Sequence, residues 1–362
     1  MNKEIISDKQ GIAIIVIFIA GTSSIMPLAL QAEQNVWLAI LLSMIMALIM
    51  SLILIKLHII FSGKNLFDIC EICLGKFFGK ILIAIFSLYT FNEGVEVLVN
   101  NSQFITDTGL PETPDIIIRI FFLILCIWSA KEGIELIGRW SSLFFVPFVF
   151  FSFISFILLM PRMDINNMLP ILDINFKPVF KAAFASFSFP FGEIVMLSMI
   201  FSDFKNEKSY YKIYFLGLLI GGICTLILSL STILVLGPIE PLNENYSAYS
   251  TIAKIDIRDF IQRLEIMSSL IFVIGSFLKF SVLILASCMG FSKIFKIKDY
   301  RHIIVPICLL TLNFSFISFK NRMDLIQWNY IAFSYYIFPL EVIFPIMLLI
   351  TSKLKNKLIK LP

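Results

Sequence analysis

The chain has 362 residues, of which 59% are hydrophobic and 15% are charged, and its mean hydropathy is +0.92. A soluble domain of this length could not bury so much apolar surface, so the composition predicts an all-α polytopic membrane protein with essentially no soluble domain. The net charge of +4 does not indicate nucleic-acid binding, because the basic residues fall in short segments between apolar runs.

The apolar runs predict about 10 transmembrane helices when about 20 residues are allowed for each span. We interpret the first run as an uncleaved span and not as a signal peptide, because Glu4 and Asp8 accompany Lys3 and Lys9 and no small-residue cleavage site follows. The expected spans are residues 10–31, 36–60, 81–105, 115–131, 136–160, 179–203, 211–237, 262–289, 302–319 and 328–352.

The distribution of basic residues predicts the orientation of these spans. Most of the 29 lysines and arginines fall in segments that share one side if the amino terminus is cytosolic, and the opposite loops at 32–35 and 107–114 have none. Cytosolic loops are enriched in basic residues, so both termini are expected in the cytosol. Two outer loops, 161–178 and 238–261, are longer. Ser250–Phe260 in the second is expected to be an interfacial helix or a surface loop packed over the bundle.

Two of the expected spans contain features that interrupt a helix. The first span has Gly21-Thr22-Ser23-Ser24, with a proline shortly after, and the sixth has Ser188-Phe189-Pro190-Phe191-Gly192-Glu193. Pro190 lacks a backbone donor, Gly192 weakens a helix, and Glu193 is unfavourable in hydrocarbon. Irregular backbone at membrane depth is tolerated where it is buried in protein or lines a cavity. Both spans are therefore expected to be broken around a small ligand.

The positions of the two breaks indicate an internal repeat. We expect a single membrane domain over residues 1–362, in which residues 1–160 form one five-helix repeat and residues 179–352 form a second. Five is an odd number of spans, so the second repeat would be inserted upside down relative to the first. Interrupted spans at matching places of inverted repeats are typical of a transporter binding site at the bilayer midplane.

Four ionisable residues fall near the centres of their expected spans: Glu93, Glu193, Lys279 and Glu341. A charge at the bilayer centre costs about 2.5–3.5 kcal/mol on insertion scales, so these side chains should face the interior of the bundle. Each belongs either to a binding site or to a structural ion pair, or is a neutral carboxyl group.

Three hypotheses follow for the charges at the breaks. Glu193 would cap the second half of its span, or would bind the ammonium group of an amino acid. The amides after Gly21 would suit the carboxylate of the same ligand. Lys279 would take the place of a sodium ion and bridge to carbonyl groups of the first span, which predicts sodium-independent binding.

Motifs of enzymes and of metal sites are missing from the sequence. It contains no G-x-S-x-G, H-E-x-x-H or P-loop pattern. Cys70 and Cys73 form one C-x-x-C without a second pair, so ordinary small apolar residues are favoured over a zinc or redox role. We therefore expect no catalytic residue, no cofactor and no metal ion.

Five motifs, spread over nearly the whole chain, recur together in one family. They are Gly21, Leu74-Gly75-Lys76 with Gly79-Lys80, Asn167-Met168-Leu169-Pro170-Ile171, Phe189-Pro190-Phe191-Gly192-Glu193-Ile194 and Arg263-Leu264-Glu265. In these motifs the chain resembles the B subunits of bacterial spore germinant receptors, also called spore germination permeases.

The resemblance implies the LeuT-like 5+5 inverted repeat of the amino acid–polyamine–organocation superfamily, with broken helices 1 and 6. It also implies a receptor subunit in the inner membrane of the spore, which senses a nutrient germinant, commonly an amino acid, together with an A subunit and a lipoprotein C subunit. The ligand-binding residues that it implies, partly by analogy of fold, are Gly21, Thr22, Ser23, Tyr89, Glu93, Pro190, Gly192, Glu193, Ser276 and Lys279.

Two other functions remain open at this point. The chain could be an amino-acid permease driven by an ion or a proton, with Glu93, Glu193 and Glu341 as a proton relay. It could also be a membrane scaffold without a ligand, although a scaffold has no reason to keep two matched breaks. The sequence identifies neither the ligand nor the stoichiometry of a receptor complex.

Overall fold

The computed structural model describes residues 6–170, 176–202, 204, 206–255, 263–319, 328 and 332–359, with side chains to Lys355. Within these ranges the chain consists of helices and their connections, and no strand occurs there. Six segments are long and apolar enough to cross a membrane: Leu30–Ile60, Ile134–Arg162, Phe176–Ile200, Glu207–Leu236, Glu265–Phe295 and Ser334–Lys355. The chain is therefore an integral membrane protein built from α-helices.

The first half of the chain contains five long helices and several short turns. Its elements are α1 (Asp8–Ala20), η1 (Thr22–Ser24), η2 (Leu30–Asn35), α2 (Val36–Ile60), α3 (Leu66–Thr108), α4 (Asp115–Glu132), α5 (Ile134–Leu159), η3 (Met160–Arg162) and η4 (Ile165–Met168). Capping boxes start α1 at Ser7 and α3 at Asn65, which explains why these helices begin where they do. Gly133, at φ 87°, separates α4 from α5 by a conformation that favours glycine.

The second half is more interrupted. Its elements are α6 (Phe176–Ser186), η5 (Phe187–Phe191), α7 (Ile194–Ile200), α8 (Glu207–Leu236), α9 (Glu240–Asn243), α10 (Ser247–Ala253), α11 (Glu265–Phe295), α12 (Arg301–Ile317), α14 (Ser334–Phe338), η7 (Pro339–Ile343) and α15 (Phe344–Ile359). The six segments that are long and apolar enough to cross a membrane overlap six of the expected spans among the described residues, namely 36–60, 136–160, 179–203, 211–237, 262–289 and 328–352.

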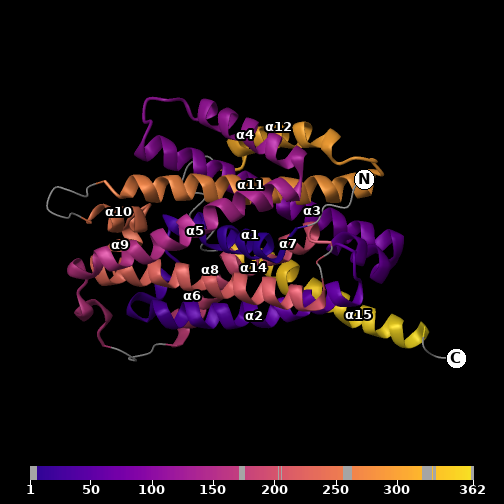
Figure 1. Ribbon diagram of the computed structural model, residues 1–362, viewed down its shortest axis with the longest axis horizontal. Helices are drawn as coiled ribbons and strands as arrows, with labels where there is room; N and C mark the ends of the chain where they lie inside the picture. The colour runs from indigo at the N-terminus through magenta and orange to yellow at the C-terminus, as the bar shows by residue number, and fades with distance from the viewer. Residues whose placement is uncertain are drawn as a thin grey trace.

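The helices form one elongated bundle (Figure 1). Helix α1 lies inside it and packs against α5, α8 and α11, and every residue from Ala13 to Ala20 is buried. The long helix α11 runs along α3, while α4 and α12 lie on one flank and α2, α6 and α8 on the other (Figure 1). The broken first span is thus surrounded by protein, as an irregular backbone in a membrane requires.

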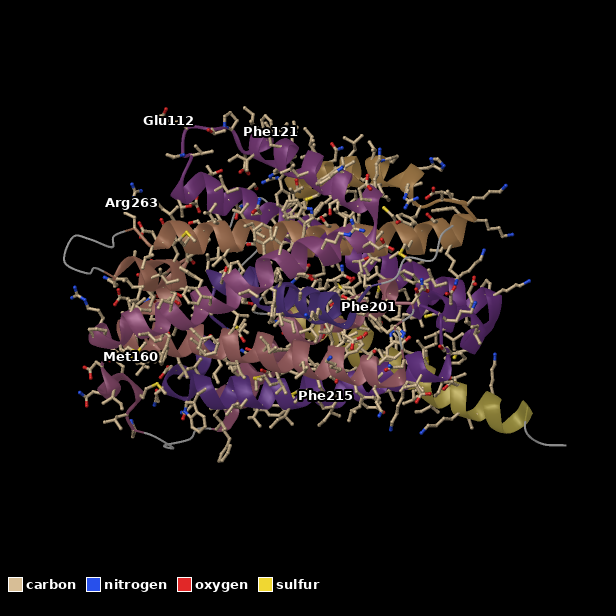
Figure 2. All side chains as sticks on the ribbon, viewed as in Figure 1. Glu112, Phe121, Met160, Phe201, Phe215 and Arg263 are labelled. Carbon is tan, nitrogen blue, oxygen red and sulfur yellow. The ribbon has the colours of Figure 1, made fainter. Side chains whose placement is uncertain are left out.

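The outer helices expose apolar side chains. Phe121 on α4 is 67% exposed and projects away from the bundle (Figure 2), and Ile49 on α2 and Phe150 on α5 are exposed as well. Such faces suit hydrocarbon, because lipid tails solvate them at no hydrophobic penalty.

The polar contacts that join distant segments near the two ends of the bundle fall into two sets, one at each end. Those at one end join segments that the basic residues place in the cytosol, and those at the other end join expected outer segments. No contact that we identify between described residues mixes the two sets. Examples are Lys212–Asp8 at 3.5 Å and Lys355–Ile72 at 2.8 Å at the first end, and Tyr246–Asp107 at 3.0 Å at the second.

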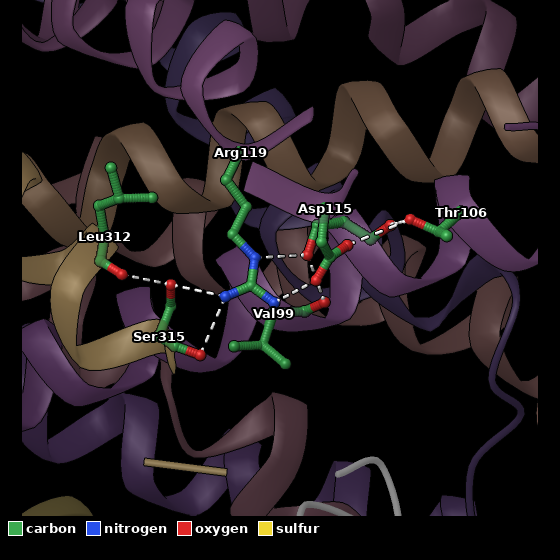
Figure 3. A network of polar contacts seen from close by, with 7 residues as sticks. Val99, Thr106, Asp115, Arg119, Leu312 and Ser315 are labelled. Carbon is green, nitrogen blue, oxygen red and sulfur yellow. Dashed lines mark hydrogen bonds and ion pairs between the residues drawn. The ribbon is translucent and has the colours of Figure 1, made fainter. Parts of the chain in front are cut away.

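A buried arginine on α4 forms hydrogen bonds to α3 and α12 at the second end (Figure 3). Arg119 is 4% exposed, and it donates from Nε to the Ser102 hydroxyl at 3.0 Å and from Nη1 to the Ser315 carbonyl at 2.9 Å. The Arg119 Nη2 forms an ion pair with the Asp115 carboxylate at 2.5 Å. The charge of Arg119 is therefore compensated inside the protein.

Two local expectations can be compared with this architecture. Of Ser250–Phe260, residues 256–260 lie outside the described residues, and the rest belongs to or follows α10. Ala248 and Ile252 of α10 are buried against α8 and α11, so this part packs over the bundle.

Cys70 and Cys73 are buried in the core, and this burial raises the pKa of the Cys70 thiol.

The break in the first span brings α1 and α11 unusually close. A Cβ atom added to Gly275 would lie 2.5 Å from the Cα of Gly21, and one added to Gly21 would lie 2.7 Å from the Cα of Gly275. Both atoms belong to backbone, so neither could rotate away. This contact explains Gly21 as a packing residue as well as a helix end.

We expect Gly275→Ala to destabilise the protein, because the added methyl group must separate α1 from α11, and overpacking of this kind typically costs about 1–3 kcal/mol. The matched control is Gly94→Ala, whose methyl group would meet only side-chain atoms at 3.5 and 3.7 Å. Both changes gain similar helix propensity, so the difference in melting temperature in detergent isolates the contact. Equal melting temperatures would contradict the close packing.

Candidate functional site

The first break is stabilised by local hydrogen bonds. The hydroxyl of Ser23 donates to the Ile19 carbonyl at 3.0 Å, and that of Ser24 donates to the Gly21 carbonyl at 2.7 Å. Further along, the amide of Leu28 donates to the Ser229 hydroxyl at 2.9 Å. These bonds replace some of those lost where α1 ends. Ser23 therefore acts on the backbone of its own segment.

The second break is centred on Phe189, whose backbone is extended at φ −135° and ψ 120°. A residue before proline avoids the helical conformation, so Pro190 accounts for this interruption. The helix resumes at α7, for which Glu193 occupies the N-cap position without a capping hydrogen bond from its side chain. The expected capping role of Glu193 is thus absent, and its carboxylate is directed elsewhere.

Glu193 and Lys279 form an ion pair in the centre of the bundle. The Lys279 Nζ lies 2.5 Å from the Glu193 Oε2, and both side chains are 0% exposed. The ammonium group also lies over the rings of Phe189 at 4.4 Å and Phe18 at 5.1 Å. Of the alternatives for these two residues, the structural ion pair matches this geometry. Lys279 reaches this carboxylate and not the carbonyl groups of the first span.

A second carboxyl group lies against the same break. Glu341 is 2% exposed, and its Oε1 accepts a hydrogen bond from the Tyr89 hydroxyl at 2.9 Å. A Cβ atom on Gly192 would collide with the Glu341 carboxylate. Gly192 therefore provides the space in which η7 and the second break approach each other.

A cavity of about 420 Å³ lies between the two breaks, bounded by residues 26–31 and 242–245 and by α3, α6 and α11, with Thr22 of η1 and Phe189 of η5 in its wall. Of the predicted binding residues, Thr22, Glu93 and Ser276 line it. Gly21, Ser23, Tyr89, Pro190, Gly192, Glu193 and Lys279 are not among the lining residues. Phe189 lines the cavity and also lies against Lys279, so its ring contacts both the cavity and the ion pair.

Two hydroxyl groups in the cavity wall lack a hydrogen-bond partner among the described residues. Thr22 is 8% exposed and Ser276 is 0% exposed, and the Oγ1 of the first and the Oγ of the second are buried without a partner. A buried polar group left in this state costs about 1–3 kcal/mol. Both groups line the cavity, so a molecule bound there can satisfy them.

Sequence reasoning missed several lining residues. Glu96 lies three residues after Glu93 on α3, and helical spacing could have indicated that both share one face. The rest carry no local signal, because only the packing of distant segments brings them together. They include Ser186, Phe272 and Phe333.

The two ends of the site differ. On the side of the expected outer loops, the cavity is lined by residues 242–245, of which Leu242 is 40% exposed. Toward the opposite end, aromatic side chains fill the bundle. They pack with ring centroids 4.9–6.2 Å apart and comprise Phe201, Phe204, Tyr210, Tyr214 and His58. The cavity therefore reaches the outer end, while aromatic rings pack together at the inner end.

Comparison with known proteins gives a consistent result. A family model described as spore germination protein matches residues 5–323. Spore germination protein KB of Bacillus subtilis (strain 168) is 25% identical over 361 residues, covering 99% of this chain and 97% of that protein. The putative spore germination protein YfkT of the same organism is 24% identical and covers 83% of this chain and 82% of its own length.

A solved structure shares the fold. Mhp1, a nucleobase-cation-symport-1 family transporter, in a closed conformation with bromovinylhydantoin bound, is similar with a TM-score of 0.67 and 13% sequence identity. The similarity covers 94% of this chain and 77% of Mhp1. The helical arrangement is thus that of a transporter.

We expect Lys279→Met alone to destabilise the protein by about 3–5 kcal/mol, because it leaves the Glu193 carboxyl group buried without its partner. Combining it with Glu193→Gln should restore most of the loss, because both charges are then gone. Melting temperatures of the two single variants and the double variant measure this coupling. Additive losses in the double variant would contradict a mutual ion pair.

Proposed function

The chain belongs to the family of spore germination proteins, and we propose that it is the subunit of a spore germinant receptor that senses a nutrient germinant. The germinant, an amino acid in this proposal, binds at the membrane midplane in the cavity between broken helices 1 and 6. The observation that carries the proposal is this cavity of about 420 Å³ with two unpartnered hydroxyl groups in its wall.

The proposed architecture has about ten spans in a LeuT-like 5+5 inverted repeat, with residues 1–160 and 179–352 as its halves. Support comes from the interruptions after Ala20 and at Phe187–Phe191, which occupy matching places in the two halves. The similarity to Mhp1 over 94% of this chain supports a transporter-like arrangement.

The predicted site residues divide into two proposed roles. Thr22, Glu93 and Ser276 contact the ligand, because they line the cavity. Gly21, Ser23, Pro190 and Gly192 shape the two breaks. Glu193 and Lys279 pair next to Phe189, and Tyr89 binds the Glu341 carboxyl group that lies against Gly192. Ligand closure of the two breaks would be a two-state event that a partner subunit can detect.

The proposed partners are the A subunit and the lipoprotein C subunit of a germinant receptor, in the inner membrane of the spore, with both termini of this chain in the cytosol. The relatives named as spore germination proteins support this assignment. The separation of polar contacts into two ends agrees with the orientation that the basic residues predict.

An ion- or proton-coupled amino-acid permease is the second candidate. One observation favours it: Glu93, Glu193 and Glu341 lie close enough to Lys279 to interact with its charge, as a proton relay would require. The fold neighbour is itself a transporter. Uptake measurements distinguish the two functions.

We expect the purified protein in liposomes to bind one or more radiolabelled L-amino acids saturably without accumulating them. Concentrative uptake driven by a proton or sodium gradient would instead show a permease. Binding that requires sodium would contradict the expectation of sodium-independent binding.

Thr22→Val and Ser276→Ala should each weaken binding about 2–10-fold, which corresponds to one lost hydrogen bond of about 0.5–1.5 kcal/mol. The matched control is Thr351→Val, because the Thr351 hydroxyl donates to the Met347 carbonyl at 2.8 Å and does not line the cavity. If both cavity variants bind as tightly as the control, the ligand lies elsewhere.

A further inference from the structure

The chemistry of the cavity wall indicates which ligands fit. We propose that the cavity selects ligands with an organic ammonium group, and that Glu93 and Glu96 on α3 bind this group. The inference rests on the proposed function, because it assigns the ligand class of the same cavity. It also assigns a binding role to Glu96 and moves the ammonium group away from Glu193.

The charges around the cavity are unbalanced. Its wall contains the carboxyl groups of Glu93, Glu96 and Glu244, whereas no lysine or arginine is among its lining residues. Beneath Phe189, Lys279 is already paired with Glu193 at 2.5 Å. The wall therefore presents carboxyl groups to the cavity without a basic side chain among its described lining residues, and a bound cation would complement them.

Glu93 and Glu96 are placed to act together. They are three residues apart on α3, so they share one face of the helix, and both line the cavity. The indole nitrogen of Trp328 donates to Glu96 Oε1 at 2.9 Å, which holds this carboxylate in position. An ammonium group has three N–H donors, so it can engage two carboxylates and a further acceptor.

The unpartnered hydroxyl groups supply this further acceptor. Thr22 and Ser276 belong to η1 and α11, which are different elements from the one that carries the acidic pair. Their buried oxygens have no partner among the described residues and face the same cavity. These groups are an independent indication of a ligand, because they would otherwise stay unsatisfied.

The size and the walls of the cavity favour an organic cation over a bare metal ion. About 420 Å³ falls within the usual range for small-molecule sites, roughly 300–1,000 Å³. Phe189, Phe272 and Phe333 supply aromatic surface for the apolar part of a ligand and attract cations through their ring faces.

Matched sets of ligands test the charge preference. The full-length protein in lipid nanodiscs is titrated with leucine, with isoamylamine, which lacks the carboxylate, and with 4-methylpentanoate, which lacks the ammonium group. A parallel set is built on alanine, and each dissociation constant is obtained from ligand-dependent thermal stabilisation. We expect the amines to bind at least as tightly as the amino acids, and the carboxylates at least tenfold more weakly.

Variants of Glu96 test whether this side chain causes the preference for amines over carboxylates. Glu96→Gln should weaken amine binding by about tenfold or more, because it removes a charge-assisted hydrogen bond. Glu96→Asp keeps the charge and should retain part of the affinity. The control is Glu112→Gln, the same chemical change at an exposed position in the loop before α4, which should leave affinity unchanged (Figure 2).

The outcomes separate this inference from the proposed function. Carboxylates that bind as well as amines, or amine binding unaffected by Glu96→Gln, would overturn the inference and leave amino-acid sensing intact. Stabilisation by potassium or sodium chloride alone that depends on Glu96 would show an inorganic cation site and overturn it too. If no amino acid or amine binds at all, the proposed function itself fails.

Discussion

The ion pair between Lys279 and Glu193 is the interaction on which the centre of the molecule depends. It links the long helix α11 to the second half of the broken sixth span, where both side chains are fully buried. A single charge at this depth is unfavourable, and a partner with good geometry offsets much of that penalty. Phe189 and Phe18 lie against the ammonium group and complete its surroundings. A proline-interrupted backbone can persist here because its neighbours hold it in place.

The pair also determines the chemistry of the cavity above it. Glu193 and Lys279 pair with each other, and the carboxyl groups that line the cavity are those of Glu93 and Glu96 on α3 and of Glu244. Glu341 lies on the other side of the break, where the Tyr89 hydroxyl binds it and Gly192 leaves space for it. The second break therefore contributes the inner wall of the site, and α3, η1 and α11 contribute most of its polar groups.

The sequence predicts the helices better than the contacts between them. Apolar runs, caps and helix-breaking residues act locally, which is why α2 spans Val36–Ile60 as expected and the sixth span breaks at Pro190. The partner of Glu193 lies 86 residues away, and only the packing of α11 against α7 brings it near. Gly21 was expected to expose amides to a ligand, but its contact with Gly275 depends on two distant helices. No periodic pattern in the sequence indicates which distant helices come into contact.

Phe189 gives a physical route from ligand binding to the rest of the bundle. Its extended backbone interrupts the sixth span, and its ring both lines the cavity and lies 4.4 Å from the Lys279 ammonium group. A ligand can shift a conformational equilibrium only if it binds the two states with different affinities. Under the proposed function, Phe189 is the side chain through which the two states would differ, because a rearrangement of the break changes its contacts with the cavity and with Lys279 together.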